Sequence, residues 1–332
     1  HVVGDPEVLV LVLLEPAGLA DHVAEEHVAE AADDTARIEG MILWPWEGHR
    51  LIVGSPGGGK YTAAIAPLLL SDDGANAFVI DPKGGEGFRY TAVFRNQLAG
   101  GGIGVRILDP CGVFEMIDTE SLNPLDLLHP RNPNLVGDTD KLVDALVVIS
   151  GHEREPVWAM SAKKALRAVI LHVATRPRPT GVAPTLMDVQ DIISEGVSTE
   201  TLLAMVDNPT ADGLVKRGAL EISDLKIAEG TWRGVKLQID ASLAFLDNPG
   251  VRATLRATSF DVSDLRRKRS SLYVVVPNKE KEPLGRWLRL MYTTVIDQID
   301  ALPGRKIHVV VDEFPALGKF ERIPVDLATM RS

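Results

Sequence analysis

A glycine-rich segment that ends in lysine is the part of this sequence whose residue types point most directly to chemistry. Its seven residues fit the pattern G-x-x-x-x-G-K: Gly54, Ser55, Pro56, Gly57, Gly58, Gly59 and Lys60. Backbone N–H groups can converge on polyphosphate oxygens only where glycines remove side chains that would collide, and the lysine reaches the outer phosphates. The segment therefore predicts a phosphate loop for ATP, with Tyr61 and Thr62 as further nucleotide contacts.

The residue after the lysine departs from this pattern. A serine or threonine usually stands there and ligates Mg²⁺, whereas this chain has Tyr61, whose phenol is too long to do so from the same backbone position. On a helix the neighbouring Thr62 is turned away by about 100°. Either other groups and water hold the Mg²⁺, or the site is weak.

A second candidate lies 252 residues beyond Lys60, where an apolar run ends in Asp312 and Glu313. An aspartate at the end of a buried strand can hold the water shell of Mg²⁺, and a neighbouring glutamate can polarise the attacking water. We assign Asp312 to the metal and Glu313 to the general base, with Lys60 as the other catalytic residue. Two acids after a strand are often only a turn, so the assignment depends on the phosphate loop.

Five apolar runs that end in polar or turn residues are typical of buried strands in a parallel sheet. They are Arg50–Gly54, Ala77–Asp81, Gly104–Asp109, Ser271–Pro277 and Ile307–Asp312. Three of the five end on aspartate at the side of the sheet where α/β folds bind ligands, although an aspartate also simply opens turns. We predict an α/β fold in which Tyr61–Leu70 continues the phosphate loop as a helix.

The stretch between Asp126 and about Phe260 has helical periodicity and no convincing strand. The expected helices are Lys141–Ile149, Val157–Thr175, Thr185–Ser194, Thr199–Asp207, Leu214–Leu225, Thr231–Leu246 and Val251–Ala257. Thr185 and Asp188 have the spacing of a capping box, which marks a helix start. We interpret this stretch as an all-α subdomain inserted into the sheet. It explains the 252-residue separation, which disfavours a small-molecule kinase.

The chain is thereby expected to have four parts. Residues 1–40 are an N-terminal segment of uncertain fold, in which Asp21–Arg37 could form an acidic helix. Residues 41–127 are the first part of a nucleotide-binding domain, 128–260 the all-α insertion, and 261–332 the second, C-terminally truncated part. The first residue is His1 rather than Met, so we expect a piece of a longer protein.

Composition excludes several classes of protein. The 332 residues carry 35 Lys and Arg against 46 Asp and Glu, a net charge of −11, so a uniformly basic nucleic-acid coat is excluded. A polyanion must meet a local basic patch or walls built by several subunits. The single cysteine, Cys111, excludes an intrachain disulfide and a cysteine-cluster metal site. The longest strongly apolar run, Val8–Leu14, is far shorter than the ~18 residues of a membrane helix.

Several strings in the sequence resemble the TraG/TraD-like conjugative coupling proteins of type IV secretion systems. They are Phe78–Glu86, which follows the phosphate loop, Asn123–Asp126 at the start of the helical stretch, Trp158 with the helix behind it, Ser271–Pro277 followed by Trp287, and Val311–Gly318, which is the most specific piece. The resemblance extends from about residue 48 to 332. It implies a RecA-like P-loop NTPase sheet with an all-α insertion, in which Lys60 is the phosphate-loop lysine and Asp312 and Glu313 are the Walker B pair.

The resemblance also implies a setting for the chain. Such proteins form hexamers around a channel and couple ATP hydrolysis to the passage of single-stranded DNA or relaxase–DNA complexes into the secretion channel. Family members carry membrane helices N-terminal to this region, so we expect a soluble fragment that works at the cytoplasmic face of the bacterial inner membrane. The arginine finger and the sensor residues stay unassigned. The alternative is a nucleotide-gated platform that recruits substrates with little motor activity.

The remaining candidates are expected to be structural. Lys83 should pair with a nearby carboxylate rather than touch nucleotide, and His308 should be a satisfied core imidazole. The basic run Arg266–Arg269 is expected to be a solvated loop, with DNA or a neighbouring subunit as the rival partner. We expect Trp158, Trp232 and Trp287 to belong to the core, and Cys111 to have no catalytic role.

Overall fold

The fold is given by a computed structural model, which describes residues 8–14, 36–38, 41–43, 49–53, 59–100, 104–149 and 156–329. Its main feature is a six-stranded sheet with the order β4-β1-β8-β5-β7-β6. The strands are β1 (Val8–Leu14), β4 (Arg50–Val53), β5 (Asn76–Asp81), β6 (Val105–Leu108), β7 (Ser271–Val275) and β8 (Ile307–Val311). All neighbouring pairs are parallel, which confirms the α/β class and the five expected strands.

The N-terminal region differs from the expectation. The run Val8–Leu14 forms β1, which was not predicted as a strand, and it lies between β4 and β8. Neighbouring strands are about 4.8 Å apart, so the strand that enters the phosphate loop is about 10 Å from the strand that ends in the acid pair. Ala36–Ile38 forms β2, paired antiparallel with β3 (Met41–Leu43). The prediction that the acidic helix extends to Arg37 is therefore wrong, because Ala36 and Arg37 belong to β2. Residues 21–35 lie outside the described residues.

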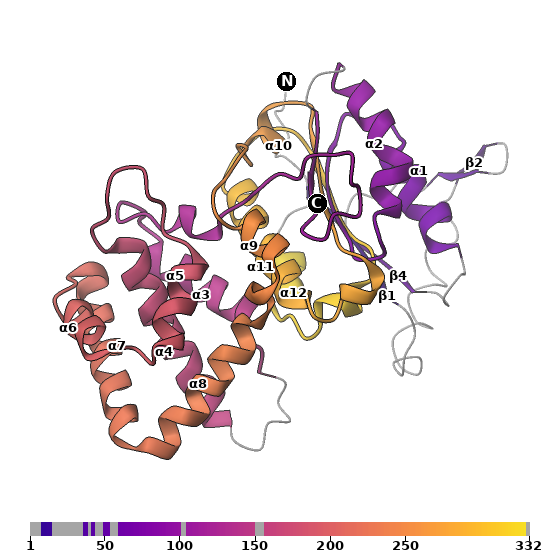
Figure 1. The fold of residues 1–332 in the computed structure, drawn as a ribbon. Coiled ribbons are helices and arrows are strands. Elements are labelled where there is room, and N and C mark those ends of the chain that lie inside the picture. The colour runs from indigo at the N-terminus through magenta and orange to yellow at the C-terminus, as the bar shows by residue number, and fades with distance from the viewer. Residues whose placement is uncertain are drawn as a thin grey trace.

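Both faces of the sheet are covered, as a parallel sheet requires (Figure 1). Alternate side chains of β5 point to opposite faces, so Ala77 and Val79 pack with a helical segment at Tyr61–Ile65, α1 (Ala66–Leu69) and α2 (Glu86–Leu98). Phe78 and Ile80 belong to the larger core on the other side, to which α11 (Gly285–Asp300) contributes. The expected helix after the phosphate loop is confirmed, and its first turn is a π-helix.

From Pro124 to Phe260 the described residues contain helices and no strand. The longer ones are α3 (Leu135–Leu146), α4 (Pro156–Thr175), α5 (Leu186–Ser194), α6 (Thr199–Val206), α7 (Thr210–Ile227), α8 (Glu229–Leu243) and α9 (Pro249–Thr254). In Figure 1, α3 to α8 form a lobe beside the sheet, and α4 packs against α3, α5, α7 and α8. The capping box of Thr185 and Asp188 is confirmed. The boundaries at residues 128 and 260 stay predictions.

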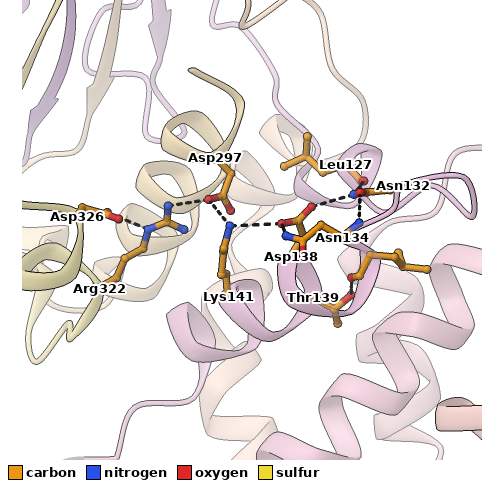
Figure 2. A network of polar contacts seen from close by, with 10 residues as sticks. Leu127, Asn132, Asn134, Asp138, Thr139, Lys141, Asp297, Arg322 and Asp326 are labelled. Carbon is orange, nitrogen blue, oxygen red and sulfur yellow. Dashed lines mark hydrogen bonds and ion pairs between the residues drawn. The ribbon is translucent and has the colours of Figure 1, made fainter. Parts of the chain in front are cut away.

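A network of ion pairs joins this lobe to the helices beside the sheet (Figure 2). Asp297 of α11 accepts from Lys141 of α3 at 2.9 Å and from Arg322 of α12 (Arg322–Thr329) at 2.6 Å, both at the same oxygen. Arg322 also donates from Nε to Asp326 at 2.9 Å. Arg289 of α11 adds a second link, since it donates to carbonyl oxygens at the end of α3 and just before Gly318. The junction is therefore held by buried or half-buried charges from three helices.

Candidate functional site

The two acids at the end of β8 are buried although they carry charge. Asp312 and Glu313 are 3% and 4% exposed, and the N–H of Asp312 donates to the carbonyl oxygen of Ile80 at 2.9 Å. Glu313 has a left-handed backbone, with φ 72° and ψ 66°, and a short 3₁₀-helix, Phe314–Leu317, follows it. A residue other than glycine in this conformation is strained, and such strain collects at functional sites. The turn ends β8 abruptly and leaves both carboxylates at the carboxyl edge of the sheet.

Lys83 is the cation that faces these acids. It follows β5, and its Nζ lies 3.1 Å from Asp312 Oδ1 and 2.9 Å from Glu313 Oε2. The Nζ of Lys281 lies 3.9 Å from the other oxygen of Glu313. Burial acts to lower the pKa of Lys83, but the bonds to Glu313 and Asp312 outweigh it and raise that pKa. The prediction that Lys83 pairs with a carboxylate is confirmed, and its partners are the two acids singled out for catalysis.

Asp81 at the end of β5 adds a third acid to this edge. Its two carboxylate oxygens accept the N–H groups of Lys83 at 3.1 Å and of Gly87 at 2.6 Å. Burial, helped by the negative charge of Asp312, raises the pKa of Asp81 to about 6. Burial also raises the pKa of Asp312, against the opposing effect of Lys83. The sequence analysis did not assign Asp81 to the site. Its position at the end of a strand, two residues before Lys83, could have indicated it.

The phosphate-loop residues Gly54, Ser55, Pro56, Gly57 and Gly58 lie outside the described residues. Gly59 has φ +77°, a conformation that favours glycine, and Lys60 is half-buried where the helical segment begins. The hydroxyl of Thr62 is exposed and donates to the carbonyl oxygen of Gly59 at 3.0 Å. The structure thus places the end of the expected loop at the start of a helix, as phosphate binding at a helix N-terminus requires.

Tyr61 connects the loop to the acids. Its hydroxyl donates to the carbonyl oxygen of Glu86 at 3.4 Å, on α2. Burial raises the pKa of Tyr61, and the charges of Asp81 and Asp312 raise it further. Because those charges act on the phenol, the residue after Lys60 lies within electrostatic range of both acids. The loop helix and the ends of β5 and β8 therefore meet at one edge of the sheet.

The donor set at this edge suits a magnesium ion bound with water and phosphate. Asp312 Oδ2 is buried and has no hydrogen-bond partner among the described residues, so one hard oxygen ligand is available. Mg²⁺ is usually held by one or two carboxylates, several waters and substrate phosphates rather than by a full protein cage. Accordingly, no group of three or more His, Cys, Asp and Glu side chains suited to a metal ion occurs among the described residues.

Other candidates from the sequence are structural, some in unexpected ways. His308 is 2% exposed and its Nε2 lies 2.6 Å from Asp73 Oδ2, so it is a core imidazole as expected, but its buried Nδ1 has no hydrogen-bond partner among the described residues. Burial, chiefly, raises the pKa of the Cys111 thiol to about 11, which does not suit a reactive thiolate. Trp287 is fully buried as expected and Trp232 packs against the core, but Trp158 is 38% exposed, so its assignment to the core was wrong.

The basic run Arg266–Arg269 is solvated only in part. Arg266 is 3% exposed and donates to the carbonyl oxygens of Ile299 and Arg305, so its expected exposure was wrong. The next three cations each face an aspartate, in the pairs Arg267–Asp261, Lys268–Asp264 and Arg269–Asp72. Arg267 and Lys268 remain largely exposed, with side chains 62% and 70% exposed. None of the described helices has the length and apolar character needed to cross a membrane.

Sequence comparison gives relatives of a single kind. VirD4 of Agrobacterium fabrum is 26% identical over 294 residues, which are 85% of this chain and 41% of VirD4. The conjugal transfer protein TraG of Escherichia coli is 26% identical over 302 residues, 84% of this chain and 46% of TraG. The chain thus spans less than half the length of either relative.

Among solved structures, this chain is similar to the bacterial conjugative coupling protein TrwBdeltaN70 in its unbound form, with a TM-score of 0.42 and 16% identity over 76% of this chain and 59% of that one. The plasmid coupling protein TrwB in complex with ADP and Mg²⁺ matches at a TM-score of 0.42 and 16% identity, over 76% of this chain and 60% of that one.

The family described as type IV secretory system conjugative DNA transfer matches residues 22–332. This range includes the phosphate-loop sequence, the whole helical stretch and the acid pair at the end of β8. A match over nearly the whole chain agrees with the relatives found above, and the chain is therefore a member of the type IV secretory conjugative DNA transfer family.

Proposed function

We propose that this chain is the ATPase unit of a protein that drives conjugative DNA transfer through a type IV secretion system. The observation that carries the proposal is the buried pair of Asp312 and Glu313 at the carboxyl edge of the sheet, in which Asp312 Oδ2 has no hydrogen-bond partner among the described residues. Buried acids without full pairing are costly, and such groups are concentrated at functional sites. Family membership gives the setting in which this chemistry is used.

In the proposed reaction, the chain's own residues bind the triphosphate and activate water. Lys60 and the amides of residues 54–60 contact the phosphates and stabilise the charge that develops on the outer one. Glu313 accepts a proton from the attacking water, because it is the acid next to the metal-binding aspartate. Asp312 holds the water shell of Mg²⁺. When bound, Mg²⁺ neutralises phosphate charge and orients the triphosphate for in-line attack.

The proposed partners follow from the family. They are single-stranded DNA or a relaxase–DNA complex, the components of the secretion channel, and further copies of this chain in a hexamer. A net charge of −11 is compatible with DNA handling where basic residues line only the inner wall of a ring. We place this activity at the cytoplasmic face of the inner membrane.

The first test is the variant Lys60→Ala. It should lower ATP turnover by roughly 100-fold or more, because one preorganised charge at the outer phosphates is lost. Steady-state phosphate release and binding of a fluorescent ADP analogue measure the effect. Lys319→Ala, which removes an exposed lysine paired with Glu321, is the matched control and should leave turnover unchanged. Wild-type turnover in Lys60→Ala would end the ATPase assignment.

A second candidate function is a nucleotide-gated platform that recruits substrates and hydrolyses little. Tyr61 favours it, because the hydroxyl expected on Mg²⁺ is replaced by a phenol that bonds to the carbonyl oxygen of Glu86 instead. Added single-stranded DNA separates the two functions. Stimulated hydrolysis supports the motor, whereas tight binding of substrate protein without stimulation supports the platform.

A further inference from the structure

Hydrogen bonds and close packing fix the backbone of the turn between β5 and α2. The N–H of Lys83 donates to Asp81 Oδ1, and the N–H of Gly84 donates to the carbonyl oxygen of Val276 at 3.0 Å. Gly84 and Gly85 have φ +89° and +79°, and a Cβ on Gly85 would lie 2.4 Å from the ring of Phe114. The turn is therefore tightly packed, and the part of Lys83 with freedom to move is its side chain.

That side chain separates the acid pair from water. The side chain of Lys83 is 26% exposed, whereas those of Asp312 and Glu313 are each 4% exposed. Its ammonium contacts one oxygen of each acid and leaves Asp312 Oδ2 without a hydrogen-bond partner. A ligand that approaches the acids from solvent therefore meets the Lys83 ammonium beside the oxygens it needs.

We propose that Lys83 is a built-in counter-cation of the acid pair, which a divalent cation must displace from Asp312, an inference that rests on the function proposed above. A dication at Asp312 and an ammonium 3.1 Å from the same carboxylate repel each other at short range. Lysine suits an exchangeable role, because it is a single charge on a flexible stem. Its departure also removes the closer of the two lysines that face Glu313, so metal arrival frees Oε2 of the general base.

The experiment measures Mn²⁺ binding to the nucleotide-free protein by electron paramagnetic resonance. Lys83→Met removes the competing charge and nearly keeps the length of the side chain, so Mn²⁺ should bind roughly tenfold more tightly than to the wild type. Lys83→Arg keeps the charge and should bind Mn²⁺ as the wild type does. The gain should vanish in the double variant Lys83→Met with Asp312→Asn, which lacks the ligand.

Lys281→Met is the matched control. It removes one positive charge near Glu313, but the Lys281 Nζ lies 3.9 Å from Glu313 and forms no ion pair with Asp312 among the described residues. We expect its effect on Mn²⁺ affinity to stay below about threefold, since screening by solvent weakens a more distant charge. A gain as large as that of Lys83→Met would show that overall charge, rather than displacement, sets the affinity, and would overturn the inference.

The result that overturns the inference directly is Mn²⁺ affinity in Lys83→Met equal to or weaker than that of the wild type. Circular dichroism and thermal melting establish that each variant is folded, and Lys83→Gln replaces Lys83→Met if the latter does not fold. If Lys83→Met gains tenfold in Mn²⁺ affinity but the protein binds no nucleotide, the ATPase function is rejected and the counter-cation role of Lys83 is retained. ATP hydrolysis by the wild type without any gain in Lys83→Met would reject the counter-cation alone.

Discussion

Two sets of buried charges in this molecule use the same groups in different ways. At the sheet edge, Lys83 contacts Asp312 and Glu313 from a turn, and its side chain is 26% exposed. At the junction with the helical lobe, Arg322 contacts Asp297 and Asp326, and its side chain is 15% exposed (Figure 2). In each set one cation contacts two acids, and at least one of those acids is distant from it in the sequence.

The difference lies in how the cation and the backbone are held. Arg322 and its partners lie on regular helices, and the planar guanidinium donates to two acids at once, a geometry that suits a permanent link. At the sheet edge the acids follow a strand through a left-handed Glu313, and the cation is a lysine that can leave without disturbing its backbone. We infer that the junction is built for stability and the sheet edge for exchange with a ligand.

The largest expected effect is on catalysis, when an acid at the sheet edge is replaced. Glu313→Gln should lower turnover by about 10²–10⁴-fold and leave ADP binding within a fewfold of the wild type, because the amide cannot take a proton from water. Phosphate release and binding of a fluorescent ADP analogue separate the two quantities. Glu321→Gln, at an exposed acid beside the junction, should retain wild-type turnover. If Glu313→Gln turns over normally, the sheet-edge acids are structural too.

Replacement of the central cation at the junction should change the stability of the fold rather than turnover. Arg322→Met removes the ion pairs of Arg322 with Asp326 and Asp297 and leaves the Asp297–Lys141 pair in place, so the free energy of unfolding should fall by about 3 kcal/mol. Urea unfolding followed by circular dichroism measures this loss. The exposed pair of Arg267 and Asp261 provides the control, because Arg267→Met should cost less than about 1 kcal/mol. Equal losses in the two variants would contradict a stabilising role for the junction.

Much of the fold could be predicted because most of its elements are specified locally. The strands β5, β7 and β8 are continuous apolar runs, and the start of α5 is marked by its own capping box. The seven apolar residues of β1 carry the same signal and are flanked by Glu7, Glu15 and Pro16, so a strand here was predictable from the sequence. Its place between β4 and β8 is a non-local pairing, which no local pattern specifies.

The site was predictable in its residue types and less so in its contacts. Asp312 and Glu313 stood out because they end a strand, and Lys83 because it follows another. The closeness of Asp81 to Asp312 depends on the register that pairs Ile80 with Val311, which is a property of the assembled sheet. Arg266 was misjudged for the same reason, since the carbonyl groups that bury it come from Ile299 and Arg305.

The smallest expected effect is on the pH dependence of the free energy of unfolding, through Asp81 at the sheet edge. The pKa of Asp81 is about 6 in the folded chain against 3.8 for an ordinary aspartate, so the unfolded chain loses this proton first as pH rises. Ionisation of Asp81 therefore favours unfolding between pH 4 and 6 and lowers the free energy of unfolding by up to ~3 kcal/mol, a penalty that is complete above pH 6. Asp81→Asn should lack this decline in urea unfolding curves across that window.

Asp261 supplies the control of opposite sign. Hydrogen bonds from Ser263, chiefly from its side chain, lower the pKa of Asp261, so its ionised form stabilises the fold above the unfolded value and this contribution is lost as pH falls below about 4. Asp261→Asn should therefore change the pH profile only at the acid end and leave the decline between pH 4 and 6 intact. If the free energy of unfolding still declines between pH 4 and 6 in Asp81→Asn, another group takes up the proton in this range. That result would contradict a raised pKa of Asp81.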